Sequence, residues 1–337
     1  MIRLVSGWVV VVVVGCSAAP ESSEEPASEG EGEGEGEGEG EGEGEATEGE
    51  GEDVPDPGCG GIVAGCVADG DEFDCELVHD GLTRRYRLRV PASSEGQPAA
   101  LVFSFHGLNT TAAIQAYVSQ MAATADANGF VLVYPEGTGS ASSQSFNAGV
   151  CCGGATANNV DDVGFTLSMI EQISATLCID ERKIFASGWS NGGHMAYRLA
   201  CEHAETFAAI ASVAGLTTTS TCAPSRPVPV LQFHGTNDQI VRYETGIDGF
   251  HGAEDIVADW ADRNGCSADE AIIYQQGDVT CRSHSECSEG SAAELCTVDG
   301  GGHTWPGGNA VPFLGSTTDD ISASDHMAAF FAAHPRP

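Results

Sequence analysis

The chain has 337 residues, of which 50 are acidic and 13 basic, and its formal net charge is −37. Such an acidic balance argues against nucleic-acid binding, which needs a basic surface. Thirteen cysteines are many for a cytosolic protein and favour an oxidising compartment.

The amino-terminal segment has the pattern of an export signal. Arg3 precedes an apolar run over residues 4–14, which as a helix would rise only about 16 Å, against about 30 Å for a bilayer core. The following Val13-Val14-Gly15-Cys16 resembles a bacterial lipobox. We therefore expect residues 1–16 to be a lipoprotein signal peptide with Cys16 lipidated, which places the protein on the extracellular face of a bacterial membrane. The alternatives are ordinary signal-peptidase cleavage near Ala18-Ala19 with secretion, or a true start further along the chain.

Residues 17–58 carry seventeen acids and no Lys or Arg, with strict Glu-Gly alternation from 29 to 45. Such a segment has almost no apolar surface to bury, so we expect a disordered Glu/Gly-rich linker. A calcium- or surface-binding tail is the alternative. Residues 59–337 retain 33 acids and 12 bases, a net charge of −21, and we expect one domain there.

From residue 59 onward, apolar runs alternate with segments of helical periodicity. Gly-rich sequence around Cys59, Cys66 and Cys75 comes first. The predicted elements follow in chain order: strands 83–90 and 99–105, helix 110–128, strand 130–134, a loop over 136–160, a helix from Asp161 or Asp162 to 177, strand 183–187, helix 191–203, strands 207–213 and 228–234, helix 253–264, strands 272–274 and 293–298, and helix 324–333. Short buried strands alternating with helices predict an α/β fold, in which a mostly parallel central sheet has helices on both faces.

Strand 183–187 leads into Gly188-Trp189-Ser190-Asn191-Gly192 and then a helix. This is G-x-S-x-G between strand and helix, where a sharp turn exposes the serine above the sheet. We predict that Ser190 is the catalytic nucleophile. A glycine-rich turn without chemistry is the alternative.

A serine hydroxyl needs a base, and in this arrangement the acid and then the histidine follow later in the chain. His303 lies in a loop after the last strand, so it is the predicted base, ahead of His326. Asp238 follows strand 228–234 and is the predicted acid, ahead of Asp248 and Asp255.

An oxyanion hole needs two backbone N–H groups aimed at the developing charge. Asn191 follows the nucleophile directly, and Leu108 follows strand 99–105, so these two residues are predicted to supply them. Trp305, Trp189 and His106 are the predicted substrate contacts. Packing the loop is the alternative for Trp305, and fixing a turn is the alternative for His106, as it is for His234.

Several stretches together resemble one extracellular esterase family, that of feruloyl and acetylxylan esterases (carbohydrate esterase family one) and polyhydroxybutyrate depolymerases. The matching segments are 105–107, 134–137, 146–149, 151–153, 161–165, 188–193, 233–238 and 302–307. The resemblance covers about residues 83–334. It implies an α/β-hydrolase fold and a Ser-His-Asp ester hydrolase that uses no metal and no cofactor.

If Cys16 is lipidated, twelve cysteines remain, enough for six bridges. Adjacent cysteines rarely pair, so Cys151 and Cys152 are each expected to bond elsewhere. Candidate pairs are Cys178 with Cys201, Cys266 with Cys287, and Cys281 with Cys296. A zinc fragment at Cys281-x-x-His284-x-x-Cys287 is the less favoured alternative.

The predicted function is that of a secreted, lipid-anchored serine esterase. Its expected partners are polymeric or small ester substrates: feruloyl or acetyl esters of plant polysaccharide, or polyhydroxybutyrate. We expect a monomer that binds no nucleic acid and reaches the membrane only through its lipid. A serine peptidase of the same fold and a non-catalytic surface binding protein remain as alternatives.

Overall fold

The computed structural model describes residues 60–219, 221–247 and 251–337. The predicted leader, the lipidation site Cys16, the linker, Cys59 and Asp248 lie outside these residues. The described strands are β1 (Cys66–Asp69), β2 (Glu72–His79), β3 (Leu82–Arg89), β4 (Ala99–Phe105), β5 (Val131–Pro135), β6 (Ile179–Trp189), β7 (Ala209–Val213), β8 (Val230–Gly235), β9 (Glu270–Gln276), β10 (Val279–His284) and β11 (Ala293–Val298). The helices are α1 (Ala112–Ser119), α2 (Met121–Asn128), α3 (Gly154–Ala157), α4 (Asp162–Ser174), α5 (Asn191–Glu202), α6 (Ala253–Arg263) and α7 (Ala323–Ala333).

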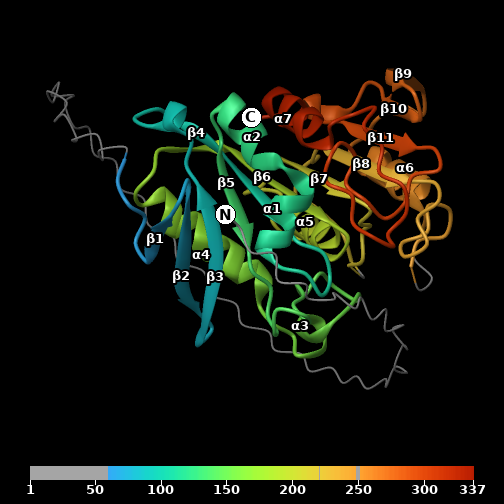
Figure 1. Ribbon diagram of the computed structural model, residues 1–337. Helices are drawn as coiled ribbons and strands as arrows, with labels where there is room; N and C mark the ends of the chain where they lie inside the picture. The colour runs from blue at the N-terminus through green and yellow to red at the C-terminus, as the bar shows by residue number, and fades with distance from the viewer. Residues whose placement is uncertain (1–59, 220, 248–250) are drawn as a thin grey trace, which may run out of the picture.

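The strands form one sheet in the order β1-β2-β3-β5-β4-β6-β7-β8-β11-β10-β9 (Figure 1). Its six central strands, β5 to β11 in that order, are parallel. The outer strands pair antiparallel at both edges. This is the predicted α/β-hydrolase fold, although its sheet is more mixed than expected.

Helices cover both faces of the sheet, as predicted. Buried side chains of α4, α5 and α6 form one apolar core, and those of α1, α2 and α7 form the other. The strands between them are almost continuously buried, which explains their uninterrupted apolar sequences.

The predicted helix 110–128 is two helices, and its prediction as one was wrong. Gln120 adopts left-handed backbone angles (φ 51°) between α1 and α2. The Met121 N–H turns to the Ser119 hydroxyl, and the Ser119 carbonyl accepts from Ser324 at the start of α7. A distant contact therefore interrupts a locally helical pattern.

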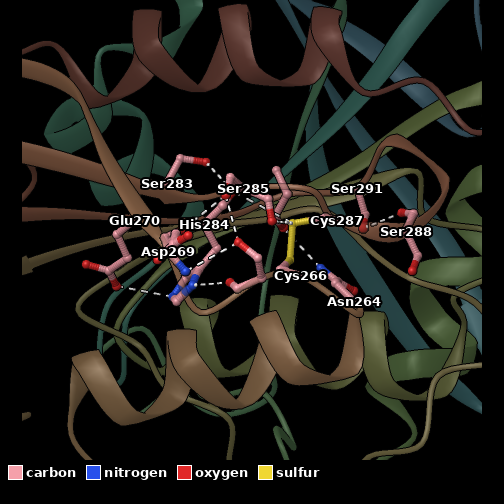
Figure 2. The surroundings of a disulfide bond; sticks show 12 residues. Asn264, Cys266, Asp269, Glu270, Ser283, His284, Ser285, Cys287, Ser288 and Ser291 are labelled. Carbon is pink, nitrogen blue, oxygen red and sulfur yellow. Dashed lines mark hydrogen bonds and ion pairs between the residues drawn. A yellow bond between two sulfur atoms is a disulfide. The ribbon is translucent and has the colours of Figure 1, made fainter.

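Five disulfides join pairs of described residues: Cys66–Cys75, Cys151–Cys152, Cys201–Cys222, Cys266–Cys287 and Cys281–Cys296. The last two pairs were predicted; Figure 2 shows Cys266–Cys287 among the polar groups beside it. Bridges of this number suit an oxidising, extracellular compartment.

Two of the expectations about cysteines were wrong. Cys151 and Cys152 bond each other, and both lie buried in one loop. Cys178 is disulfide-bonded, but not to Cys201, which bonds Cys222 in the segment passing over the end of α5. The zinc alternative also fails, because Cys281 and Cys287 belong to different disulfides.

In the described part of the chain, no helix has the length and apolar character needed to cross a bilayer.

Candidate active site

Ser190 stands at the turn between β6 and α5, where the backbone is strained. Its angles are φ 55° and ψ −118°, a positive φ that is uncommon for any residue other than glycine. A Cβ on Gly188 would overlap the Gly192 carbonyl, and one on Gly192 would overlap the Phe105 carbonyl. The glycines of the motif therefore let strand, turn and helix approach closely, as the sequence predicted.

Asp238 and His303 come together at the carboxyl ends of β8 and β11. These strands are parallel neighbours with Gly235 opposite Val298, so the loops that follow them meet. His303 Nδ1–H donates to Asp238 Oδ2 at 2.7 Å. The two side chains are almost fully buried, with exposed fractions of 4% and 0%.

The other oxygen of Asp238 is held by its own loop. Oδ1 accepts from the Ile240 and Val241 N–H groups at 2.8 and 2.9 Å. Burial opposes the charged carboxylate, but the neighbouring His303 and these hydrogen bonds outweigh it and hold the pKa of Asp238 below its ordinary value. Asp238 is therefore a fixed anion that orients the His303 ring.

Ser190 lies near this pair. The indole of Trp189, the residue before it, lies 5.6 Å from the His303 ring between centroids. Within the described part of the chain, the Ser190 hydroxyl makes no hydrogen bond. Catalytic hydrogen bonds are often long before substrate binds, so the lack of a hydrogen bond here does not argue against a catalytic role for Ser190.

His106 and His234 use both ring nitrogens internally. Gly137 N–H donates to His106 Nε2, and Nδ1–H donates to the Gly107 carbonyl, while burial lowers the pKa of His106 to about 4. His234 Nε2–H donates to the Val241 carbonyl, and its Nδ1 accepts from Gln232. Both histidines fix turns. His106 was predicted to contact substrate, but it has no exposed surface, which favours the alternative that it fixes a turn.

The weaker candidates for base and acid lie elsewhere. His326 packs edge-on against Phe233 and Tyr274, below the sheet's carboxyl edge, and burial lowers its pKa. Asp255 is exposed on α6 and, among the residues that the structure describes, forms an ion pair with His251.

The two predicted oxyanion donors lie beside Ser190. A Cβ on Gly107 would come 3.5 Å from Ser190 Cβ and 3.2 Å from the Trp189 ring, so the loop carrying Leu108 lies against Ser190. Asn191 N–H is at the amino terminus of α5, where helical N–H groups have no partner in the helix. The helix dipole also favours negative charge there.

Two predicted substrate contacts are more buried than expected. Trp305 has no exposed surface, and its Nε1–H donates to the Ser324 hydroxyl, which matches the packing alternative. Trp189 is 3% exposed, and its Nε1–H lacks an acceptor among the described residues.

The sequence reasoning missed a buried ion pair behind the site. Arg84 on β3 donates to Asp162 Oδ1 at 2.6 Å, and both side chains are buried. Asp162 Oδ2 accepts from Asn147 N–H, and the Asn147 carbonyl accepts from Arg198. The arginine-rich sequence of β3 indicates an exposed strand. Alternate residues of the strand nevertheless face inward, and Arg84 is one of them.

Comparisons with known proteins agree on the kind of fold and chemistry. A family model described as the prolyl oligopeptidase family (Peptidase_S9) matches residues 116–226. "Feruloyl esterase B" of Piromyces equi is 32% identical over 234 residues, 65% of this chain, and the match spans only 42% of that protein's length. "Putative esterase NocK" of Nocardia uniformis subsp. tsuyamanensis is 31% identical over 78% of this chain and 83% of its own length.

A solved structure, the "Acetyl xylan esterase from Aspergillus awamori", has a TM-score of 0.51 at 17% identity. It covers 74% of this chain and 94% of its own, a likeness that concerns the fold. The match to NocK spans most of both proteins, and the central sheet is parallel, so the chain belongs to the α/β-hydrolase esterase family.

Proposed function

We propose that this protein is a serine ester hydrolase with Ser190 as nucleophile, His303 as base and Asp238 as the acid that orients it. The observation that carries the proposal is the buried 2.7 Å hydrogen bond between His303 and Asp238 at the sheet edge where Ser190 stands. Asp238 and His303 follow the neighbouring strands β8 and β11, and Ser190 follows β6 in the same parallel part of the sheet. More than sixty residues separate Asp238 from His303 in the sequence.

The reaction has two steps. Ser190 Oγ attacks the ester carbonyl, its proton moves to His303 Nε2, and the carbonyl oxygen becomes an anion facing the Asn191 and Leu108 N–H groups. The C–O bond then breaks and the alcohol leaves with the proton from His303. Water, deprotonated by His303, releases the acid from the acyl-Ser190 intermediate.

The proposed substrates are polymer-linked esters, in particular feruloyl or acetyl esters of plant polysaccharide. The names of the relatives, feruloyl esterases and an acetylxylan esterase/xylanase, support this class. Polyhydroxybutyrate remains a second substrate of the same reaction, from the resemblance of the motifs. The net charge of −21 over residues 59–337 suits neutral esters better than polyanions.

A serine peptidase is the second candidate function. The observation that favours it is the match of the prolyl oligopeptidase family model to residues 116–226. That match covers a third of the chain, whereas the esterase NocK is similar over 78% of it, so ester hydrolysis is the better supported activity.

We also propose that the protein is exported and held at the cell surface by lipidated Cys16, on the motif alone. A Cys16→Ser variant should leave the membrane fraction and enter the medium. Continued sedimentation of the variant with membranes would refute lipid anchoring.

The test of the reaction compares Ser190→Ala with wild type on p-nitrophenyl acetate, methyl ferulate, acetylated xylan, amorphous polyhydroxybutyrate and a prolyl p-nitroanilide peptide. Ser225→Ala, an exposed serine that bonds Glu205, is the matched control. We expect Ser190→Ala to lose hydrolysis of the esters and the control to keep it. Undiminished turnover by Ser190→Ala would refute the mechanism, and preference for the peptide would favour the peptidase.

A further inference from the structure

The loop of residues 144–155 contacts both residues that carry the predicted oxyanion donors. It includes the Cys151–Cys152 disulfide, whose two residues are only 5% and 9% exposed. The family resemblance and the triad assign no role to this pairing. Its contacts show what it holds in place.

On one side the loop forms hydrogen bonds with the Asn191 side chain. Phe146 N–H donates to Asn191 Oδ1 at 2.8 Å, and Asn191 Nδ2 donates to the Phe146 carbonyl at 3.0 Å. The same Nδ2 lies 3.9 Å from Cys152 Sγ. The side chain next to the nucleophile is therefore fixed by two loop residues, and one of its neighbours is a disulfide sulfur.

On the other side the loop contacts Leu108 and Asn109. A Cβ on Gly153 would come 2.8 Å from Leu108 Cδ1, so the residue following the disulfide lies directly against the Leu108 side chain. Asn109 N–H donates to the Gln144 carbonyl at 2.8 Å. Gly153 near one end of the loop therefore contacts Leu108, and Gln144 at the other end bonds the next residue, Asn109.

The base of the loop is itself rigidly attached to the protein. Asn147 is fixed through its N–H by Asp162 and through its carbonyl by Arg198. The Thr218 hydroxyl donates to the Ala148 carbonyl, and the Val150 N–H donates to the Thr218 carbonyl. Beyond residue 150, the Thr156 hydroxyl donates to the Cys151 carbonyl and the Ala155 N–H donates to the Ser145 hydroxyl. The disulfide closes a small ring there and restricts the backbone of residues 151 and 152, which precede Gly153.

We propose that the Cys151–Cys152 disulfide is a positioning device for the oxyanion hole. By restricting the backbone of residues 151 and 152, it keeps Cys152 beside Asn191 and Gly153 beside Leu108, so that both N–H groups face the carbonyl oxygen during attack by Ser190. This inference rests on the proposed function, and it adds that a covalent link outside the triad sets the geometry of the transition state.

The consequence for kinetics follows from the nature of an oxyanion hole. Its donors act on charge that exists only in the transition state, so a displaced donor lowers kcat more than it raises KM. Complete removal of one donor costs about 10²–10³ in kcat. Loosening both donors without removing either should cost about tenfold.

The experiment uses the full chain with Cys151→Ala/Cys152→Ala. The matched control is Cys266→Ala/Cys287→Ala, which removes a disulfide whose surroundings, shown in Figure 2, share no residue with the proposed site. On p-nitrophenyl acetate we expect kcat of the first variant to fall at least about tenfold, with KM within about twofold, while the control keeps its kcat. Affinity for a trifluoromethyl ketone, which forms a tetrahedral adduct on serine, should fall in parallel. Wild-type kcat in the folded first variant would overturn the proposal.

Hydrogen exchange gives a readout that does not depend on activity. The peptides containing residues 107–110 and 190–193 should exchange faster in the first variant and at the wild-type rate in the control. Unchanged exchange of these two peptides in the first variant would overturn the inference about the disulfide. A wild-type protein that hydrolyses no ester would refute the proposed function, and the exchange result would still decide the inference by itself. If the first variant does not fold, the single variants Cys151→Ser and Cys152→Ser take its place, because each removes the same bond and should produce the same loss of kcat.

Discussion

Replacing Asp238 with Asn tests the acid of the proposed triad while changing almost no volume. Asp238 accepts three hydrogen bonds: from His303 Nδ1–H at 2.7 Å, and from the Ile240 and Val241 N–H groups at 2.8 and 2.9 Å. All three donors approach a carboxylate whose residue is 2% exposed. An amide has one acceptor oxygen and cannot serve donors on both sides.

Either orientation of the new amide is unfavourable. With its NH₂ toward His303, Nδ1 must become the acceptor, and the ring proton then sits on Nε2, where the Ser190 proton should be received. With its NH₂ toward the loop, it faces two N–H donors, and each unsatisfied buried donor costs about 1–3 kcal/mol. The first orientation should prevail and remove the base in its working tautomer.

The wrong tautomer costs about 10⁴ in kcat in a Ser-His-Asp site, or about 5 kcal/mol of transition-state stabilisation. We therefore expect Asp238→Asn to lose about 10⁴ in kcat/KM on p-nitrophenyl acetate at pH 7. The control is Asp299→Asn, an exposed carboxylate at the same sheet edge that accepts from the Thr236 hydroxyl. A loss of less than tenfold in Asp238→Asn would refute the assigned role.

The same substitution has a signature in the pH dependence of stability. The folded-state pKa of Asp238 lies below its unfolded value of about 3.8, so its charge stabilises the fold above that pH and the contribution is lost as pH falls further. The free energy of unfolding in urea should fall more for wild type than for Asp238→Asn between pH 5 and pH 3. Parallel curves would contradict the lowered pKa.

Three further predictions concern groups outside the proposed triad. His234→Ala frees the Val241 carbonyl and loosens the Asp238 turn, so kcat/KM on p-nitrophenyl acetate should fall about tenfold, a loss of about 1–3 kcal/mol for one buried hydrogen bond; full activity would contradict this. Arg84→Met leaves Asp162 as an unpaired buried charge and should lower the unfolding free energy in urea by about 3–5 kcal/mol, whereas a change below about 1 kcal/mol would show that the pair is dispensable. Burial raises the pKa of Glu294 to about 7, so the folded state binds the extra proton and unfolding free energy should fall as pH rises from 4.5 to 7; Glu294→Gln should flatten that slope, and an unchanged slope would contradict it.

The central part of the fold could be predicted because its strands are buried on both faces. Runs such as Ala99–Phe105 and Val131–Pro135 are apolar throughout, and this is the pattern of parallel strands covered by helices. Strands β1, β2 and β10, in the antiparallel outer parts of the sheet, were missed because exposed and polar residues interrupt their apolar sequence. The break at Gln120 was missed because its cause is a contact with α7, some two hundred residues later.

The members of the candidate site could be named because each sits in a short motif at the end of a strand. Sequence could not give their surroundings, since these depend on contacts between distant segments. The burial of Trp305 and His106 depends on packing by α7 and by the 136–144 loop, and neither motif contains that information. The Cys151–Cys152 bond was missed for a different reason: the general rarity of such pairs outweighed the position of the two residues in one loop.

The central claim is that Ser190 forms the covalent intermediate, and active-site labelling tests it most directly. Wild-type protein would be treated with a fluorophosphonate, digested and sequenced by mass spectrometry. The account predicts one adduct, on the Ser190 hydroxyl, formed in step with loss of ester hydrolysis and absent from Ser190→Ala. An adduct on another residue, or ester hydrolysis that persists after complete labelling of Ser190, would contradict it.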